Sequence, residues 1–244
     1  MLNLPGLHLD HERTAAVARM MAVAAKETTY QYPWDTLQQD LQAAGYSQIT
    51  IVGYGSLVNR TSATHTVREQ SIVTAEPIVA FGVRRLFNYE MPADLDRYDP
   101  PINPRARAAL NVHVTGKVHD VVNGVTMTLS LEEIPALRQR ELYYDLVPVA
   151  CLRWNQIQDP PFLAHILSRP DRLPDKEPDN DKILEPHRHY YSLCRDGASQ
   201  FGEEFLRLWL ATTYLADAVT PVAQWETDAF SERKEDDTGP RKLE

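Results

Sequence analysis

Two changes in the spacing of apolar residues constrain the fold of this chain more than any other feature. Residues 11–29 are rich in strong helix formers and place their apolar side chains on one helical face. From residue 49 the spacing becomes that of strands, in apolar and β-branched runs interrupted by Pro77 and Gly82. Helical spacing returns at Pro186. The pattern predicts an α+β protein.

The order of these segments predicts one domain with an extension at each end. A chain of 244 residues is long enough to bury a core without disulfides or metals. We expect an N-terminal helical extension over residues 1–47, a main domain over residues 48–230 and a polar tail over residues 231–244. Residues 169–186 are rich in proline and charge, so they are expected to form a surface loop.

Local signals predict several elements of this domain. Asn123-Gly124 is the strongest hairpin signal in the chain and predicts a turn between two strands. Ser130 and Glu133 have the spacing of a capping box, which predicts a helix from there to about Tyr143. In the N-terminal extension, a second helix is expected to follow Asp35 as its N-cap.

Charge and composition exclude several classes of partner. The formal net charge is -9, and the basic residues are scattered, which argues against a nucleic-acid or anionic-membrane surface. No segment approaches the roughly 20 apolar residues of a membrane span. Cys151 and Cys194 lack the spacing of a zinc or redox site, so both are expected to be reduced thiols. We therefore expect a cytoplasmic protein that binds a small molecule, and no feature indicates its oligomeric state.

The segment ITIVGYGSL, residues 49–57, predicts a strand that runs into a glycine-rich turn. Val58 stands where a dinucleotide fingerprint needs its third glycine, and no Gly-Lys-Ser or Gly-Lys-Thr follows to make a phosphate loop. Tyr54 and Val58 also exclude Ser56 as a nucleophile elbow. Glycines on either side of Tyr54 would instead let successive main-chain N–H groups converge on an anion, for which a carboxylate is a natural choice.

Glu141 is the candidate for proton chemistry. It lies near the end of the predicted helix and just ahead of an apolar strand, where partial burial would raise its pKa. Its position alone favours a second interpretation, in which it is a surface glutamate paired with Arg138 or Arg140.

Five short segments recur in a recognisable order within residues 49–215. They are GYGSL (53–57), AFGVRRLFN (80–88), AALNV (108–112), NGVTMTLSLEEIPALRQRELYYDLVPV (123–149) and PHRHYYSLCRDGA (186–198). Their order and spacing resemble the gamma-glutamylcyclotransferase-like superfamily. The resemblance implies a compact mixed β-barrel with flanking helices and a pocket at the barrel mouth.

The resemblance also implies an activity and its residues. Glu141, in the pattern Leu-x-x-x-Glu with Leu137, would be the acid/base that cyclises a γ-glutamyl group to pyroglutamate (5-oxoproline) and releases an amine or amino acid. This is transferase or lyase chemistry of glutathione metabolism, and it requires no metal or cofactor. The residues expected to bind the substrate are Tyr54, Gly55, Ser56, Leu57 and Tyr190.

Some features depart from the family pattern and keep alternatives open. Bulky Leu142, Tyr143 and Tyr144 follow Glu141 where several members have a glycine. The chain could therefore act on γ-glutamylamines or a larger γ-glutamyl conjugate, or it could be a binding protein that lost the reaction. The role of His187 and His189 is open; two histidines without an acidic partner at a telling spacing do not indicate a metal site.

Arg84 and Arg85 form a charged pair in a predicted strand. Such a pair is more often solvated than functional, so both are expected at the surface.

Overall fold

The computed structural model describes residues 1–65, 68, 71, 75–91, 100–101, 103–169 and 184–231. Most of the predicted surface loop at 169–186, and the predicted tail beyond Ser231, lie outside the described residues. No helix within the described ranges is both long enough and apolar enough to cross a membrane.

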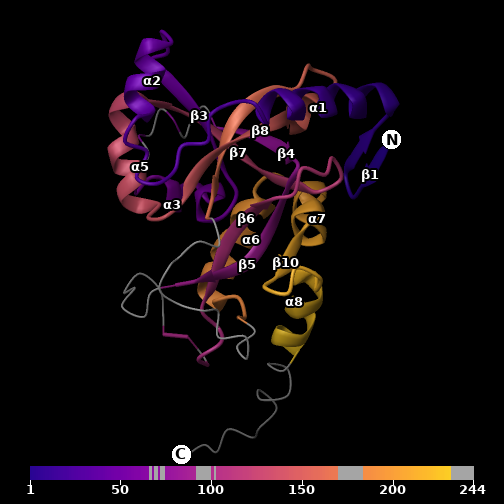
Figure 1. The fold of residues 1–244 in the computed structure, drawn as a ribbon. Helices are drawn as coiled ribbons and strands as arrows, with labels where there is room; N and C mark the ends of the chain where they lie inside the picture. The colour runs from indigo at the N-terminus through magenta and orange to yellow at the C-terminus, as the bar shows by residue number, and fades with distance from the viewer. Residues whose placement is uncertain are drawn as a thin grey trace, which may run out of the picture.

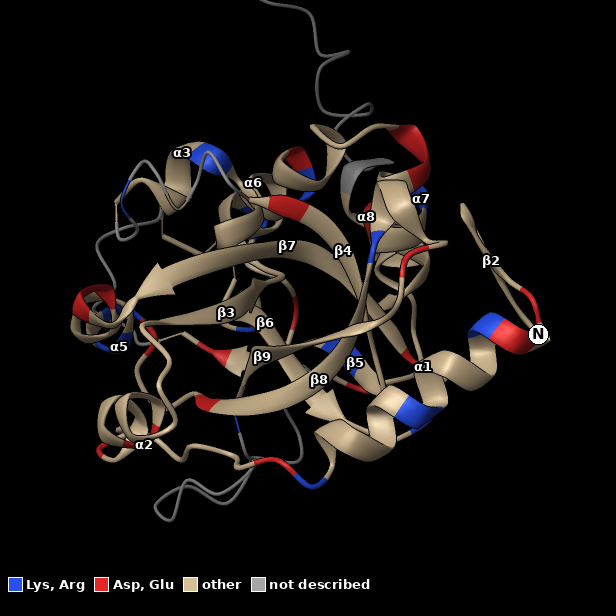
Figure 2. Cartoon of the chain, turned by 90° about the horizontal axis from the view of Figure 1, so that it is seen from above, with Lys and Arg blue, Asp and Glu red and all other residues tan. Residues whose placement is uncertain are grey.

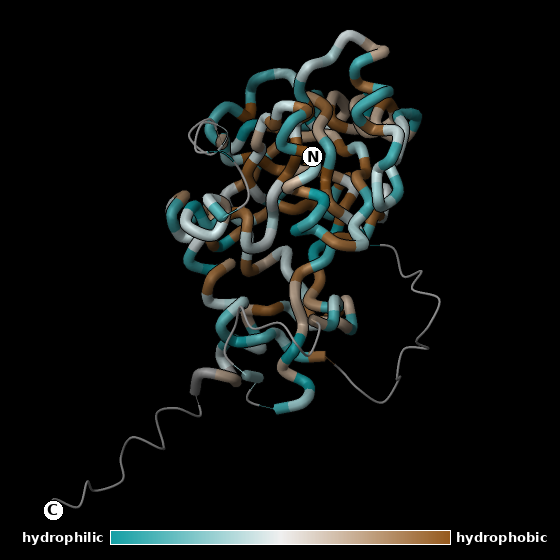
Figure 3. Tube along the Cα trace, turned by 90° about the vertical axis from the view of Figure 1, so that its left-hand side faces the viewer, coloured by the Kyte–Doolittle hydropathy of each residue, from teal (hydrophilic) through white to brown (hydrophobic). Residues whose placement is uncertain are grey.

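A closed five-stranded barrel forms the centre of the fold, in the order β3-β7-β4-β8-β9. Its strands are β3 (Gln48–Gly53), β4 (Glu76–Phe81), β7 (Val121–Ser130), β8 (Asp145–Arg153) and β9 (Phe162–Ser168). Neighbours are antiparallel except β9 and β3, which close the barrel in parallel. Figure 2 shows the five strands encircling a common interior, and Figure 3 shows the hydrophobic residues concentrated inside this part of the molecule. The predicted mixed barrel with flanking helices is confirmed.

A three-stranded sheet extends from one end of the barrel (Figure 1). It consists of β5 (Val83–Glu90), β6 (Ala108–Val114) and β10 (Thr213–Leu215). Beside it lie α6 (Arg188–Ser199), α7 (Glu203–Ala211) and α8 (Val222–Ser231). Aromatic residues of α6 and α7, including Tyr191 and Trp209, are buried in the same core as the barrel interior.

The first 47 residues contain a hairpin as well as the two expected helices. Strands β1 (Leu2–Leu4) and β2 (Leu7–Leu9) pair with each other and precede α1 (His11–Ala24) and α2 (Leu37–Ala43). The N-cap of α2 is Thr36, one residue after the expected Asp35. Apolar side chains of β2 and α1 bury a second core against the outside of the barrel, where they meet Val79, Phe81 and Leu152.

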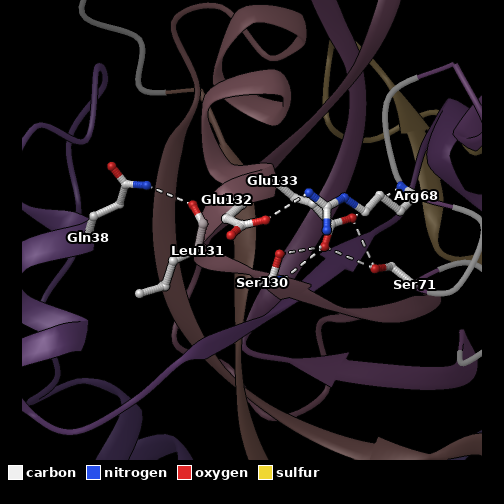
Figure 4. A network of polar contacts seen from close by, with 7 residues as sticks. All are labelled: Gln38, Arg68, Ser71, Ser130, Leu131, Glu132 and Glu133. Atoms are coloured by element: carbon white, nitrogen blue, oxygen red, sulfur yellow. Dashed lines mark hydrogen bonds and ion pairs between the residues drawn. The ribbon is translucent and has the colours of Figure 1, made fainter.

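The segment that carries Glu141 begins at the predicted capping box. Residues Leu131–Glu133 form the 3-10 turn η2, and α5 (Ile134–Arg140) continues from it. The Glu133 carboxylate accepts hydrogen bonds from the main-chain N–H groups of Ser130 and Arg68 and from the Ser71 hydroxyl (Figure 4). Burial raises the pKa of Glu133, but these hydrogen bonds outweigh burial, and the net pKa lies below its ordinary value. The helix ends at Arg140, three residues before the expected end.

The turn expected at Asn123-Gly124 is wrong, because both residues lie inside the continuous strand β7. Asn123 is fully buried, and its side-chain amide donates to the carbonyl of Phe205. A Cβ atom at Gly124 would collide with the carbonyl oxygen of Gly53. Contacts with residues distant in sequence, Phe205 and Gly53, therefore explain why asparagine and glycine occupy these two positions. The chain turns instead before β7, where Gly116 has a φ of +67°.

Candidate functional site

Strand β3 leads directly into the glycine-rich loop. Tyr54 follows the strand, and residues Ser56–Val58 form the 3-10 turn η1, which Asn59 joins to the short helix α3 (Arg60–Ala63). The side-chain amide of Asn59 donates to the carbonyl of Leu193 in α6, 3.3 Å away. A Cβ atom at Gly197 would lie 2.7 Å from the Asn59 nitrogen, so glycine lets α6 pack directly on the loop.

The two glycines of the loop stand where a side chain has no space. Gly55 has a φ of −108°, outside the left-handed region. A Cβ atom at Gly53 would lie 2.7 Å from the Cβ of Leu57, and one at Gly55 would lie 2.5 Å from the hydroxyl oxygen of Tyr190. Close packing therefore restricts both positions to glycine.

A pocket lies between this loop, the C-terminal end of α5 and the first turn of α6. All six residues that the sequence proposes for the site contribute to its wall, together with Leu110, Tyr144 and Leu167. The six are Tyr54, Gly55, Ser56, Leu57, Glu141 and Tyr190. The fold thus brings a carboxylate and the glycine-rich loop, nearly ninety residues apart in sequence, to one cavity.

Glu141 caps the C-terminal end of α5, and 16% of its side chain is exposed. Its Oε1 lies 3.0 Å from Nε of Arg140, whose side chain is only 7% exposed. The ion pair considered for a surface glutamate is therefore present, but its carboxylate lines the pocket. Arg138, the other partner considered, lies nearer the surface and reaches Asp35 at 3.8 Å.

Arg140 also ties the carboxylate to the loop. Its Nη2 donates to the Ser56 hydroxyl at 2.9 Å and its Nη1 donates to the carbonyl of Ser62 at 3.0 Å. One guanidinium therefore contacts both the residue that could move a proton and the loop that could hold a substrate. Sequence spacing alone indicates Arg140 only as an ion-pair partner of Glu141 and assigns it no part in the site.

The main chain of the loop offers hydrogen-bond donors. Within the described part of the chain, the N–H groups of Gly55, Ser56 and Leu57 donate no hydrogen bond. The carbonyl of Tyr54 accepts from Arg85 Nη1 at 3.4 Å. Because C=O and N–H of a trans peptide point in opposite directions, the N–H of Gly55 points away from Arg85. Such donors can bind a carboxylate or a developing oxyanion.

Arg85 corrects the expectation of a solvated pair, because its side chain is fully buried. It donates to the main-chain and side-chain oxygens of Asn123 at 2.7 and 3.0 Å and to the Thr213 hydroxyl at 2.7 Å. Its guanidinium also lies 4.9 Å from the ring centre of Trp209. Burial lowers the pKa of Arg85 to about 9. The partners come from β7, α7 and β10, so no local pattern could have revealed this burial.

Three tyrosines complete the polar wall. Burial raises the pKa of Tyr54 and of Tyr144 well above the ordinary value, and the nearby charge of Glu141 raises both further. Both phenols therefore stay protonated at neutral pH. The hydroxyl of Tyr144 donates to the carbonyl of Leu110 at 3.0 Å, whereas Tyr190 approaches the loop from α6.

His187 and His189 do not form a shared site. His187 is buried and caps α6, with its Nδ1 accepting from the main-chain N–H of Tyr190 at 3.5 Å. His189 lies on the exposed side of the same helix. Among the described residues, no group of three His, Cys, Asp or Glu side chains is arranged to hold a metal ion.

Comparison with known proteins gives matches among solved structures, whereas no protein-family model and no curated protein matches the chain. The chain is similar to a structure named gamma-glutamyl cyclotransferase, with 11% identity and a TM-score of 0.46, over 68% of this chain and 88% of that one. The likeness is one of fold.

Two further structures show similar values. YkqA from Bacillus subtilis has 14% identity and a TM-score of 0.45, over 69% of this chain and 55% of that one. A yeast gamma-glutamyl cyclotransferase specific to glutathione has 13% identity and a TM-score of 0.43, over 68% of this chain and 97% of that one. With TM-scores below 0.5, these likenesses carry no argument about activity, and the site is assigned from the geometry of this chain alone.

Proposed function

We propose that this protein is a cyclotransferase that converts the γ-glutamyl group of a small γ-glutamyl compound to pyroglutamate and releases an amine or amino acid. The observation that carries the proposal is that the Glu141 carboxylate and the donor-rich loop at 55–57 line the same pocket. The choice of a γ-glutamyl substrate rests on the resemblance of the sequence motifs to the gamma-glutamylcyclotransferase-like superfamily. The pocket geometry supports it, because Glu141 would be the base and the loop at 55–57 would bind the anionic group.

The reaction would be intramolecular. Glu141 would accept a proton from the substrate's α-amino group, whose nitrogen then attacks the γ-carbonyl carbon. The new C–N bond closes a five-membered lactam, the original amide C–N bond breaks, and Glu141 returns the proton to the departing nitrogen. No co-reactant is consumed. Holding both reacting groups of one molecule in contact can contribute on the order of 7–11 kcal/mol to lowering the barrier.

The glycine-rich loop and the tyrosines of the pocket wall would hold the substrate in the folded conformation that cyclisation needs. The N–H groups of Gly55, Ser56 and Leu57 would bind the α-carboxylate or the developing oxyanion. The protonated phenol of Tyr54 would donate a hydrogen bond to the substrate without adding negative charge beside the Glu141 carboxylate, whereas the Tyr144 hydroxyl already donates to Leu110.

A non-catalytic binding protein with this fold is the second candidate. The ion pair between Glu141 and Arg140 favours it, because a carboxylate held by a guanidinium can bind a substrate ammonium without accepting its proton.

The test is pyroglutamate release from γ-glutamyl dipeptides, glutathione and γ-glutamylamines. We expect the wild type to release pyroglutamate from at least one of them and Glu141→Gln to be slower by about 10²- to 10⁴-fold, the usual contribution of a positioned proton acceptor. Glu132→Gln is the matched control, because its side chain is 78% exposed and it should not affect the rate. Binding without pyroglutamate release would favour the second candidate, and undiminished release by Glu141→Gln would overturn the mechanism.

A further inference from the structure

Arg169 directly follows the strand that contributes Leu167 to the pocket wall. Leu167, near the end of β9, lines the pocket. Arg169 is the first residue after this strand, two positions beyond Leu167. On the neighbouring strand β6, Leu110 lines the pocket and Asn111 follows it.

The backbone of Arg169 is fixed by a reciprocal pair of hydrogen bonds. Its N–H donates to Oδ1 of Asn111 at 2.8 Å, and its carbonyl accepts from Nδ2 of Asn111 at 3.1 Å. Asn111 is itself buried. A buried side chain that satisfies both main-chain groups holds Arg169 beside the pocket.

The guanidinium of Arg169 lies close to two aromatic rings, and one of its nitrogens lacks a hydrogen-bond partner among the described residues. Its central carbon lies 4.0 Å from the ring centre of Tyr89 and 5.6 Å from that of Tyr143. Its Nη1 is buried and has no hydrogen-bond partner among the described residues. Stacking on aromatic rings leaves the edge of a guanidinium free, and that edge matches the two oxygens of a carboxylate. A buried N–H without an acceptor is costly, so a ligand that supplies one is favoured.

The charges of Arg169 and Glu141 act on the same phenols. The ring of Tyr89 lies 5.6 Å from that of Tyr144, which lines the pocket. Burial is the largest influence on the pKa values of Tyr89 and Tyr144 and raises both. The negative charge of Glu141 raises both pKa values further, whereas the positive charge of Arg169 lowers them. A cation and the proposed proton acceptor therefore flank one aromatic wall.

We propose that Arg169 is a carboxylate-binding subsite beside the pocket, which holds the carboxylate of the leaving amino acid or peptide. The inference rests on the proposed function for the identity of the ligand. It distinguishes γ-glutamyl amino acids and peptides, which carry this carboxylate, from γ-glutamylamines, which do not. Bulky Tyr143, which departs from the family pattern, then has a role as one face of the guanidinium stack.

The experiment compares γ-glutamyl-alanine with γ-glutamyl-alaninamide, which has nearly the same shape but no terminal charge. The expected KM of the wild type is about 10-fold or more lower for the acid than for the amide, as a charge-assisted hydrogen bond implies. Arg169→Gln should remove this difference by raising KM for the acid alone, with kcat unchanged. Arg169→Lys should keep part of the preference because it keeps the charge.

Arg153→Gln is the matched control, because Arg153 also stacks on an aromatic ring, that of Phe162 at 4.9 Å, but does not line the pocket. Equal KM values for acid and amide in the wild type would overturn the inference without any variant. An equal rise for both ligands in Arg169→Gln would assign Arg169 to packing and would also overturn it.

Calorimetric binding of the two ligands to the Glu141→Gln protein separates this inference from the proposed function. If neither ligand is turned over by the wild type, the cyclotransferase proposal fails, yet tighter binding of the acid that depends on Arg169 still supports the subsite. If pyroglutamate is released but acid and amide bind equally, the subsite fails and the cyclotransferase proposal stands.

Discussion

At the scale of single residues, the loop at 53–57 depends on the absence of one methyl group. Gly55 faces the Tyr190 hydroxyl so closely that a Cβ atom would lie 2.5 Å from that oxygen. The next nearest atoms, in the ring of Tyr190 and in Leu110, would be 3.7 Å away, which is ordinary contact. The hydroxyl oxygen therefore accounts for the restriction to glycine.

We predict that Gly55→Ala destabilises the fold by about 1–3 kcal/mol, as overpacking of a tight site does, and impairs substrate binding. Tyr190→Phe removes the colliding oxygen, so Gly55→Ala should cost less stability in that background. Urea unfolding of the two single variants and the double variant measures the coupling. Additive effects would show that another atom restricts the loop.

At the scale of elements, the helix that presents Arg140 and Glu141 is anchored at its start by a buried carboxylate. Glu133 accepts hydrogen bonds from Ser130, Arg68 and Ser71, whereas its neighbour Glu132 makes an ion pair with Arg68 at the surface (Figure 4). Because exposed pairs contribute little, the anchoring comes from Glu133.

Glu133→Gln should therefore lower the free energy of unfolding at pH 7 by about 1–2 kcal/mol, and Glu132→Gln should leave it nearly unchanged. The folded-state pKa of Glu133 lies below its ordinary value of 4.5, so its contribution is present above that value and is lost as the pH falls through the folded-state pKa. The stability difference between wild type and Glu133→Gln should consequently shrink below about pH 4.5. Denaturant unfolding at pH 7 and pH 3.5 checks this, and a difference independent of pH would contradict it.

The sequence predicted what local patterns determine and missed what distant contacts determine. The strand into the loop, the capping box and the helix ahead of Glu141 all follow from spacing within a few residues, and they were found. Asn123-Gly124 has the local sequence of a turn, but Asn123 accepts a hydrogen bond from Arg85 and Gly124 packs against the main chain of Gly53. The barrel-closing strand β9 was not predicted, because its apolar run follows two prolines and its partner β3 is far away in sequence.

At the scale of the whole molecule, the N-terminal hairpin and α1 cover the outside of the barrel with a core of their own. Leu7 is fully buried there, on the opposite side of β4 and β8 from the barrel interior. We predict that Leu7→Ala costs about 2–5 kcal/mol of stability, as a buried Leu→Ala cavity does. Because Leu7 does not line the pocket, the protein that remains folded should keep its kcat.

Val23→Ala is the matched control on α1, because Val23 is 48% exposed and should change stability little. Thermal unfolding and pyroglutamate release measured on the same samples check both parts. Unaltered stability of Leu7→Ala would mean that this core contributes nothing to the fold.

The parallel pairing of β9 with β3 has a consequence for how the protein is made. Until residues 162–168 have left the ribosome, β3 has one unpaired edge, and an exposed edge strand is a site where chains associate. Closing a barrel through strands so distant in sequence is slow compared with forming helices or hairpins. The pocket, whose wall includes Leu167 of this barrel-closing strand, is therefore completed only after β9 has paired with β3, and until then the free edge of β3 is open to association with other chains.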